Sequence, residues 1–422
     1  DYRKGSVNTL ICTSSLELGI DVGNTALVIQ YNSPRDASRM SQRLGRSGHK
    51  IKETAIGRIV STEETQILES AVIARRTLSG ELEPSRIREM PLAVLANQII
   101  SWTVCDKNVD KKTFLDTIKR AYPFKNFNEE SLTDMLDLLD KVHQNRTIGK
   151  AVRQGPRAMK YFHGNLSLIP DQRTSGVRDI TTRKMIGRLD ERFILDLVPG
   201  DKIVFRGSVW AVVEIDEEVT VSPSSSLGEL PRWIGEDIPV PFSVAQEASQ
   251  RLSDGNWAGL PITREALDVL QKYHEDIADA GVMPSPSCLT VEQHERLFIL
   301  NYPGGSRLNR TIGMIVTAML TAKSGYKIGF QFDPYRIILD VPARTTVKDL
   351  LAILKGFVPE VGSLLRFAIK DSPSLKPQLL HSARKMGAIA PDADIGKFGM
   401  KKLMEAYSCL LYTSDAADDI PR

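Results

Sequence analysis

Short apolar runs alternate with polar, glycine-containing segments over the first sixty residues. Residues 7–13 and 26–31 are rich in branched side chains and are bounded by Gly, Asn or Pro, which is typical of buried parallel strands. Periodicity alone does not separate such strands from short buried helices. Residues 35–45 carry helix-forming side chains, and residues 57–60 form a further apolar run. Together these runs predict the second half of an α/β domain.

Helical spacing of apolar side chains follows. Residues 63–82 keep this spacing up to a stop at Gly80. Asn128 is suited to cap a helix that begins just after it. We expect three shorter helices at residues 92–103, 111–120 and 129–141, closed by an extended segment at residues 148–152. This order predicts a winged-helix unit, which either sets the angle of a duplex or braces two domains, and the pattern does not choose between these roles.

Strand-and-turn chemistry begins near residue 160. Apolar runs between residues 160 and 222 are separated by turn residues such as Pro199 and Gly200, which predicts a small β-barrel or sheet. Residues 243–277 have helical patterns, and residues 298–400 mix strands with helices. The expected fold class is therefore α/β plus α+β.

Composition narrows the class of protein. With 422 residues, 42% hydrophobic and 25% charged, the chain suits a globular protein of about three domains. A net charge of only +3 means that any nucleic-acid surface must come from local clustering of basic residues.

The four cysteines form no CxxC pair, so we expect no metal site and a reduced, cytoplasmic setting. No apolar run approaches the roughly 18 residues of a membrane span, and we expect the true N-terminus to lie upstream of Asp1.

Basic residues cluster between Arg146 and Arg192. Eleven Lys or Arg fall in this stretch against four acids, with Tyr161, Phe162 and His163 among them. Cations with interleaved aromatic rings suit a groove that follows a nucleic-acid backbone while the rings stack on bases. A solvated sheet surface with core aromatics is the alternative. The candidate nucleic-acid-binding residues within the run are Arg153, Arg157 and Lys160.

The segment Gln42-Arg43-Leu44-Gly45-Arg46-Ser47-Gly48-His49 resembles motif VI of superfamily-two helicases. Small residues flank Arg46, so its backbone can approach a partner surface closely. A guanidinium brought across a domain cleft can neutralise charge on a transferred phosphoryl group. We interpret Arg46 as an arginine finger, with Gln42 and Arg43 as further catalytic candidates. Arg43 either binds ATP or holds the motif together by ion pairing, and His49 stands where such motifs commonly have a second arginine.

The upstream segment from Cys12 to Asp21 resembles helicase motif V. Hydroxyls and backbone amides at the end of a strand can hold a nucleic-acid phosphate without reading sequence, which makes Thr13, Ser14 and Ser15 candidates for that role. Gly19 and Asp21 are ATP-binding candidates, and Asp21 could accept a bond from the ribose or from Arg43. A strand end merely capped by hydroxyls is the alternative.

Two further motifs that ATP binding requires are missing. No GxxxxGK[ST] loop occurs in the chain, and no acidic DExH box follows a strand. ATP and Mg²⁺ would therefore be bound mainly by an upstream domain.

Trp233 is the remaining candidate nucleic-acid-binding residue. Prolines and a glycine would hold its loop stiff for stacking on a base, although tryptophan is more often a core residue.

Beyond these motifs the chain is similar to the Lhr family of large ATP-dependent helicases from Asp1 to about Tyr407. The resemblance rests also on Arg-Ala-Tyr-Pro-Phe at 120–124, Gly-Arg-Leu-Asp-Glu-Arg-Phe at 187–193 and Arg-Trp-Ile-Gly-Glu-Asp-Ile-Pro-Val-Pro at 232–241. It predicts a RecA-like half domain at 1–62, a linker helix and winged helix at 63–158, a family-specific C-terminal domain at 159–407 (β-rich to 240, mixed α/β after 241), and a disordered or non-native tail at 408–422.

The same resemblance implies a function. It implies a motor that uses ATP to move 3′ to 5′ along single-stranded DNA and to unwind DNA duplexes and RNA:DNA hybrids in DNA repair, with Trp233 stacked on a base. The chain alone would bind DNA and hydrolyse no ATP. Two other hypotheses stay open at this point, a non-catalytic nucleic-acid-binding module and an RNA-remodelling helicase.

Overall fold

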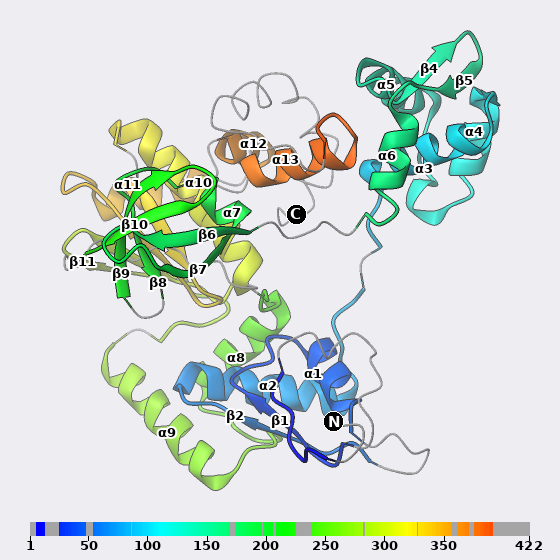
Figure 1. Cartoon of the computed structure of the whole chain (residues 1–422). Coiled ribbons are helices and arrows are strands. Elements are labelled where there is room, and N and C mark those ends of the chain that lie inside the picture. The colour runs from blue at the N-terminus through cyan, green and yellow to red at the C-terminus, as the bar shows by residue number, and fades with distance from the viewer. Residues whose placement is uncertain are drawn as a thin grey trace. The chain divides into compact units, whose positions relative to one another are not determined.

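The computed structural model divides the chain into two compact units. The first contains residues 1–85 and 237–368, and the second contains residues 86–236 and 369–420 (Figure 1). The structure describes residues 6–12, 25–47, 54–85, 87–168, 174–195, 197–205, 208–224, 238–281, 283–326, 328–356, 361–370 and 375–390. Each unit has its own buried core.

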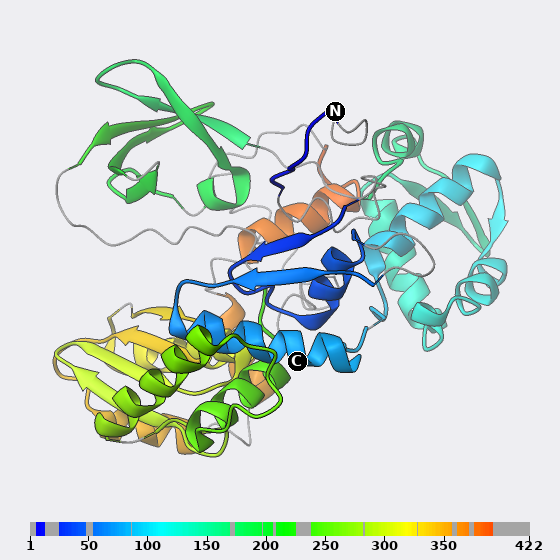
Figure 2. The ribbon, with the colours of Figure 1, turned by 90° about the horizontal axis from the view of Figure 1, so that it is seen from below.

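The first unit begins with two strands and their helices. They are β1 (Val28–Tyr31), α1 (Ala37–Leu44), β2 (Gly57–Val60) and α2 (Glu64–Ser79). β1 pairs with β2 in parallel, and the two run side by side in Figure 2. α2 ends at Gly80, which adopts a left-handed φ of 70°, as the sequence predicts. Helices α1 and α2 share a core with α8 (Phe242–Asp254) and α9 (Arg264–Asp279).

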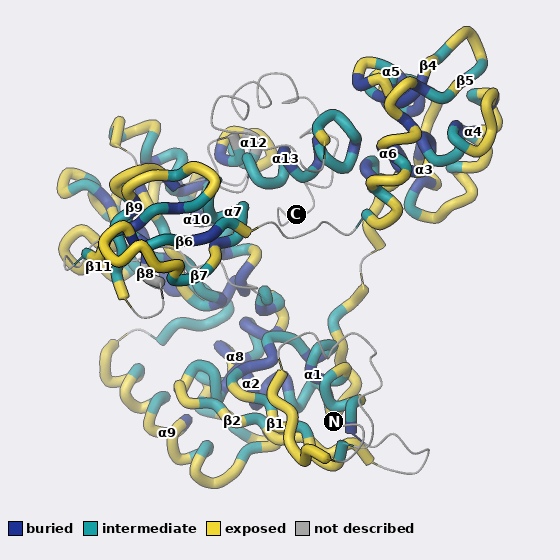
Figure 3. Tube along the Cα trace, in the orientation of Figure 1, coloured by how far each residue is buried: buried dark blue, intermediate teal, exposed yellow. Residues whose placement is uncertain are grey.

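Two predictions about these strands are wrong. Residues 7–12 form no strand and are exposed, because a strand needs a neighbour to satisfy its backbone groups and none of the described residues pairs with them. β1 and β2 are parallel, as expected, but are not buried. The side chains of Ile29 and Tyr31 are 64% and 67% exposed, and much of the β1 tube has the colour of exposed residues in Figure 3.

The rest of the first unit is a four-stranded antiparallel sheet with a long helix packed on it. The sheet has the order β11-β12-β14-β13. Its elements are β11 (Thr290–His294), β12 (Leu297–Asn301), α10 (Gly305–Ser324), β13 (Gly329–Phe332), β14 (Arg336–Asp340) and α11 (Val347–Gly356), followed by α12 (Val361–Lys370). Alternate residues of β12 and β14, such as Phe298 and Ile337, face α10 and are fully buried. These strands and helices agree with the mixed pattern predicted for residues 298–400.

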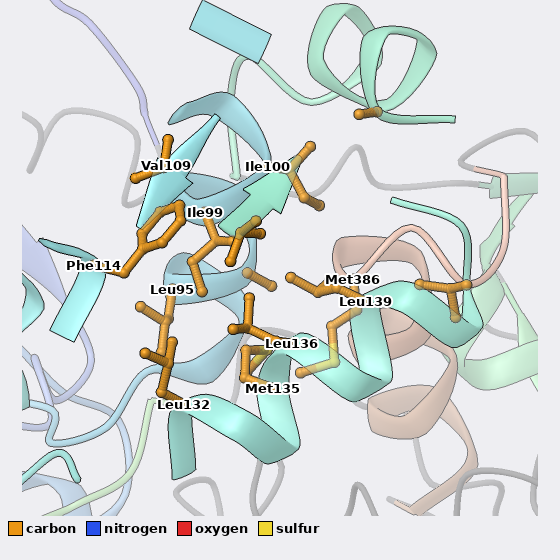
Figure 4. Close-up of a cluster of buried hydrophobic side chains, with 14 of the residues drawn as sticks. Leu95, Ile99, Ile100, Val109, Phe114, Leu132, Met135, Leu136, Leu139 and Met386 are labelled. Atoms are coloured by element: carbon orange, nitrogen blue, oxygen red, sulfur yellow. The ribbon is translucent and has the colours of Figure 1, made fainter. Parts of the chain in front are cut away.

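The second unit begins with the winged helix that the sequence predicts. Its elements are α3 (Leu92–Cys105), β3 (Val109–Asp110), α4 (Lys111–Ile118), a 3₁₀ helix (Tyr122–Phe124), α5 (Glu129–Lys141), β4 (Asn145–Ile148), β5 (Ala151–Gln154) and α6 (Ala158–Gly164). Asn128 caps α5 by accepting a hydrogen bond from the amide of Ser131 at 2.8 Å. β4 and β5 form a hairpin, and Leu95, Phe114, Leu136 and their neighbours fill the core (Figure 4).

A five-stranded sheet follows, in the order β7-β6-β10-β9-β8. Its elements are β6 (Thr174–Asp179), β7 (Met185–Asp190), α7 (Glu191–Ile194), β8 (Lys202–Phe205), β9 (Ser208–Ile215) and β10 (Val219–Pro223). The sheet is open, since its edge strands β7 and β8 do not pair with each other in the part of the chain that the structure describes. It is therefore a sheet and not the closed barrel that the turn pattern also allowed.

Helix α13 (Leu375–Lys385) joins the two parts of the second unit. Arg384 binds Glu191 of α7 through two hydrogen bonds of 2.6 and 2.8 Å. Met386, just beyond the helix, is 1% exposed within the winged-helix core, as Figure 4 shows. The hydroxyl of Tyr161 donates to the carbonyl of Lys385, and the amide of Gln144 donates to the carbonyl of Gly387 at 3.1 Å.

Candidate functional site

The loop that leads from β1 into α1 has a constrained backbone. Asn32 and Arg35 have φ angles of 57° and 73°, in the left-handed region that side chains other than glycine seldom adopt. Ser33 accepts a hydrogen bond from the amide of Arg35 at 3.1 Å. Asp36 then caps α1 by accepting from the amide of Arg39 at 2.7 Å. The start of α1 is thus fixed by short local bonds.

Two carboxylates from outside this loop, Glu83 and Glu69, also bind the loop or the start of α1. Glu83 accepts hydrogen bonds from the amides of Ala37 and Ser38 at 3.0 and 2.8 Å, and from the hydroxyl of Ser38 at 2.9 Å. Burial of Glu83 would raise its pKa, but these hydrogen bonds outweigh that effect and lower it. Burial raises the pKa of Asp36, and the nearby charge of Glu83 adds to the increase. The helix N-terminus favours both negative charges.

Glu69 of α2 binds the loop from the other side. Its carboxylate, 1% exposed, lies 3.2 Å from Nη1 of Arg35 and accepts a hydrogen bond from the hydroxyl of Tyr335 at 2.9 Å. Burial first, and then the charge of Glu69, raises the pKa of Tyr335 well above its usual value. Tyr335 therefore stays protonated and donates. The turn between β13 and β14 is in this way tied to the loop before α1.

The last turn of α1 carries the predicted motif VI residues. Arg43 donates a hydrogen bond from Nη1 to the side-chain carbonyl of Gln30 in β1. Gly45 ends the helix, Arg46 is half-buried and Gln42 is exposed. The hydroxyl of Ser47 donates to the carbonyl of Leu44 at 2.9 Å and accepts from the amide of Ile56 at 3.2 Å. Gln42, Arg43 and Arg46 thus follow one another at the end of α1, and the side chain of Arg43 is bound to β1.

Gly45 has a feature that the local backbone does not explain. Its φ of −61° is ordinary for a helix, and a Cβ atom placed there would meet only carbonyl oxygens at 3.4 and 3.5 Å. Neither strain nor crowding among the described residues requires glycine at this position.

The other predicted residues of this region lie outside the described residues, as does Trp233. They are Thr13, Ser14, Ser15, Gly19, Asp21 and His49.

The β4–β5 hairpin presents the basic run of the winged helix. Arg146 and Arg153 are directly opposite each other across the hairpin, and both are exposed. Arg153 donates to the side chain of Asn108 at 3.1 Å. Lys150 at the turn, and Arg157 and Lys160 at α6, are also exposed. None of these five cations forms an ion pair with a described residue.

The cations of the sheet differ from those of the hairpin. Arg178 is bound to Glu218 through hydrogen bonds of 2.6 and 3.1 Å, and Arg188 donates to the hydroxyl and carbonyl of Thr174. Within the predicted basic run, Arg178 of the sheet thus has a counter-charge, whereas the hairpin cations form no ion pair with a described residue. Tyr161, expected among the stacking aromatics, is buried in the core instead, because the segment after α13 covers it.

Sequence reasoning missed two features of these sites. Arg146 belongs to the basic run, but its place opposite Arg153 becomes visible only when the hairpin register is known. The role of Glu83 is not visible in the sequence either, because two acids, Glu81 and Glu83, follow the helix-ending Gly80 and the pattern does not distinguish them.

Among the described residues there is no group of three His, Cys, Asp or Glu that could hold a metal ion. In that same part of the chain, no helix combines the length and the apolar character that crossing a membrane requires. Cys12, Cys105 and Cys288 are not in disulfides.

Comparison with known protein families gives three matches along the chain. Residues 1–50 match the helicase conserved C-terminal domain. Residues 75–229 match the winged helix domain of large helicase-related protein, and residues 283–411 match the DEAD/H associated family. The three matches follow one another in the order expected from the resemblance.

Individual relatives agree with these matches. The chain is 24% identical over 409 residues to an ATP-dependent helicase Lhr-Core of Methanocaldococcus jannaschii, covering 91% of this chain and 48% of that protein. It is 29% identical over 360 residues to an Escherichia coli protein named Lhr helicase/uracil glycosylase, covering 76% of this chain and 23% of that one. The chain thus spans at most about half the length of these relatives.

A solved structure shares the fold. The Mycobacterium smegmatis helicase Lhr, whose structure was solved with ssDNA and AMP-PNP, matches 98% of this chain and 52% of its own with a TM-score of 0.71 at 21% identity. The order of the family matches, the relatives and this shared fold lead to one conclusion. The chain belongs to the Lhr family of helicases.

Proposed function

We propose that the whole protein is an ATP-driven helicase that moves 3′ to 5′ along single-stranded DNA and unwinds DNA duplexes and RNA:DNA hybrids in DNA repair. This chain supplies its nucleic-acid-binding surface and one side of its nucleotide site. The observation that carries the proposal is the last turn of α1, where Arg43 is anchored to β1 and Arg46 follows a glycine that the backbone does not require. Such a surface suits close approach by a second domain.

The arginines of α1 have distinct roles in this proposal. Arg46 is the finger that stabilises charge on the transferred phosphoryl group. Arg43, held by Gln30, binds ATP and orients the motif, and the exposed Gln42 lies beside them on the nucleotide side. Gly19 and Asp21 complete this side of the site. ATP with Mg²⁺ supplies the phosphoryl group and the divalent charge, and an upstream domain holds most of both.

The exposed face of β1 and β2 supports an upstream RecA-like domain as the partner. Parallel sheets are normally covered on both faces, yet Ile29, Tyr31 and Val60 are at least half exposed here. Further strands and helices of the same protein would bury these side chains. We place those elements in the half of the relatives' length that this chain does not match.

The β4–β5 hairpin supports nucleic acid as the ligand. Like charges directly opposite each other destabilise a hairpin. Arg146 and Arg153 are so placed, and neither forms an ion pair with a described residue. A phosphate backbone would remove this repulsion and release counterions. Arg157 and Lys160 extend the same basic surface, which we propose follows the strand. In the same proposal Thr13, Ser14 and Ser15 bind strand phosphates, and Trp233 stacks on a base.

The proposal is tested by unwinding assays on the full-length protein. Duplexes of DNA and of RNA:DNA with a 3′ single-stranded tail should be separated in the presence of ATP and Mg²⁺, and matched duplexes with a 5′ tail should not. The present chain alone should bind single-stranded DNA and hydrolyse no ATP. Separation that needs no nucleotide, or that starts from the 5′ tail, would contradict the proposal.

An RNA-remodelling helicase is the second candidate. The cations of the hairpin would contact phosphates, which DNA and RNA share, so they do not choose between the two sugars. Matched DNA and RNA tracking strands separate the candidates, and faster movement along RNA would favour this second function. A binding module without a motor has no need for the anchored arginines of α1.

A further inference from the structure

The segment that connects the two units reaches back to α1. The second unit begins at Arg86, three residues after Glu83. Glu83 is half-buried, whereas Glu81, Leu82, Pro84 and Ser85 are exposed. The carboxylate of Glu81 binds Arg75 of α2. The hydrogen bonds that Ala37 and Ser38 donate to Glu83 therefore attach the connecting segment to α1.

The position of these bonds on α1 matters for the arginines at its other end. α1 has eight residues, so its two ends are about 12 Å apart at 1.5 Å per residue. A helix of two turns moves as a rigid body, and a rotation at its first turn displaces its last turn. Glu83 makes three charge-assisted hydrogen bonds to the first turn, and such bonds are shorter and stronger than neutral ones.

We infer that Glu83 is a positioning residue, through which the segment entering the winged-helix unit holds α1 and its arginines in the orientation required for ATP hydrolysis. The inference rests on the proposed function and adds a route for its regulation. Tension on the connecting segment, when the winged helix binds a strand, would be transmitted through Glu83 to α1. Binding of nucleic acid and hydrolysis of ATP would in this way be coupled.

The experiment uses the full-length protein and its DNA-stimulated ATP turnover. Glu83→Ala should lower kcat by about 10- to 100-fold, as expected for a misplaced catalytic group, with single-strand affinity unchanged. Glu83→Gln, which keeps one acceptor oxygen, should be intermediate. Glu81→Ala is the matched control, because it removes a carboxylate of the same segment that does not contact α1, and its kcat should equal that of the wild type.

A double mutant distinguishes positioning from general destabilisation. If Glu83 acts through the finger, Glu83→Ala should have no further effect on kcat in an Arg46→Ala background. Amide exchange at Ala37 and Ser38 should become faster in Glu83→Ala and not in Glu81→Ala. Equal kcat for Glu83→Ala and wild type would overturn the inference, and so would a loss that is undiminished in the Arg46→Ala background. An Arg46→Ala variant with normal turnover would instead refute the proposed function itself.

Discussion

Replacing Gly387 by alanine tests how tightly the segment after α13 is docked in the winged helix. Gly387 has a φ of 69°, and a Cβ atom there would lie 2.6 Å from Cδ2 of Tyr161 and also against Nε2 of Gln144. The Gln144 amide can move, but it then loses its bond to the Gly387 carbonyl. The Tyr161 ring is buried in the core and has little freedom to move.

The expected cost has two parts. A left-handed conformation costs a residue with a Cβ atom about 1–2 kcal/mol. Overpacking in a filled core adds about 1–3 kcal/mol. Gly387→Ala should therefore destabilise the docked segment by about 2–5 kcal/mol. Gly325→Ala provides a matched control, because Gly325 also ends a helix with a φ of 73° but has nothing within 4 Å of the added Cβ. Only the first part, about 1–2 kcal/mol, applies there.

Native-state hydrogen exchange measures both variants locally, because it reports the free energy of opening for each protected amide. In Gly387→Ala, the opening free energy of the amides of α13 should fall by the sum of the two parts. In Gly325→Ala, the opening free energy of the last amides of α10 should fall only by the cost of the left-handed conformation. Equal losses in the two variants would refute the packing of Met386 and Gly387 against Tyr161.

Three further predictions concern other contacts. The double variant Arg146→Ala, Arg153→Ala should keep or raise the stability of the winged helix in urea and should weaken single-strand binding. The slope of the logarithm of the binding constant against the logarithm of the salt concentration should fall by about 1.4 for two lost phosphate contacts. A lower stability would contradict the repulsion between the two arginines. Burial raises the pKa of Tyr161 to about 12 from 10.0. The contribution of the buried, protonated phenol to the free energy of unfolding is therefore complete below pH 10 and is lost as the pH rises towards 12. The wild type should lose more unfolding free energy between pH 9 and 11 than Tyr161→Phe. Tyr335→Phe leaves the buried carboxylate of Glu69 with one hydrogen-bond partner fewer and should lower the free energy of urea unfolding by about 1–3 kcal/mol. Tyr302→Phe should cost less, because the hydroxyl of Tyr302 makes no hydrogen bond to a described residue.

Local chemistry made much of the fold predictable. The cap at Asn128 and the stop at Gly80 act within a few residues of themselves, so the helices that they bound follow from the sequence. The winged-helix order could be read from helical spacing for the same reason. The apolar run at residues 7–12 looked like a strand, but pairing depends on a neighbour that local sequence does not contain.

The site was less predictable because its contacts join distant residues. Tyr161 looked like a stacking ring, yet Lys385 and Met386, more than 200 residues away in sequence, cover it. Glu83 caps a helix that begins 46 residues before it. Arg43 and Arg46 could be proposed from the sequence because their motif is short and contiguous. The opposed pair of Arg146 and Arg153 needed the register of a hairpin, which spacing alone does not fix.

The turnover of ATP by the full-length protein with Arg46→Ala is the most direct test of the claim that α1 completes a nucleotide site. Removal of a finger should lower the DNA-stimulated kcat by about 10³- to 10⁵-fold and leave single-strand affinity unchanged. Arg39→Ala, which removes a guanidinium from the same helix near its start, serves as the comparison and should retain far more activity. A wild-type kcat in Arg46→Ala would contradict the account.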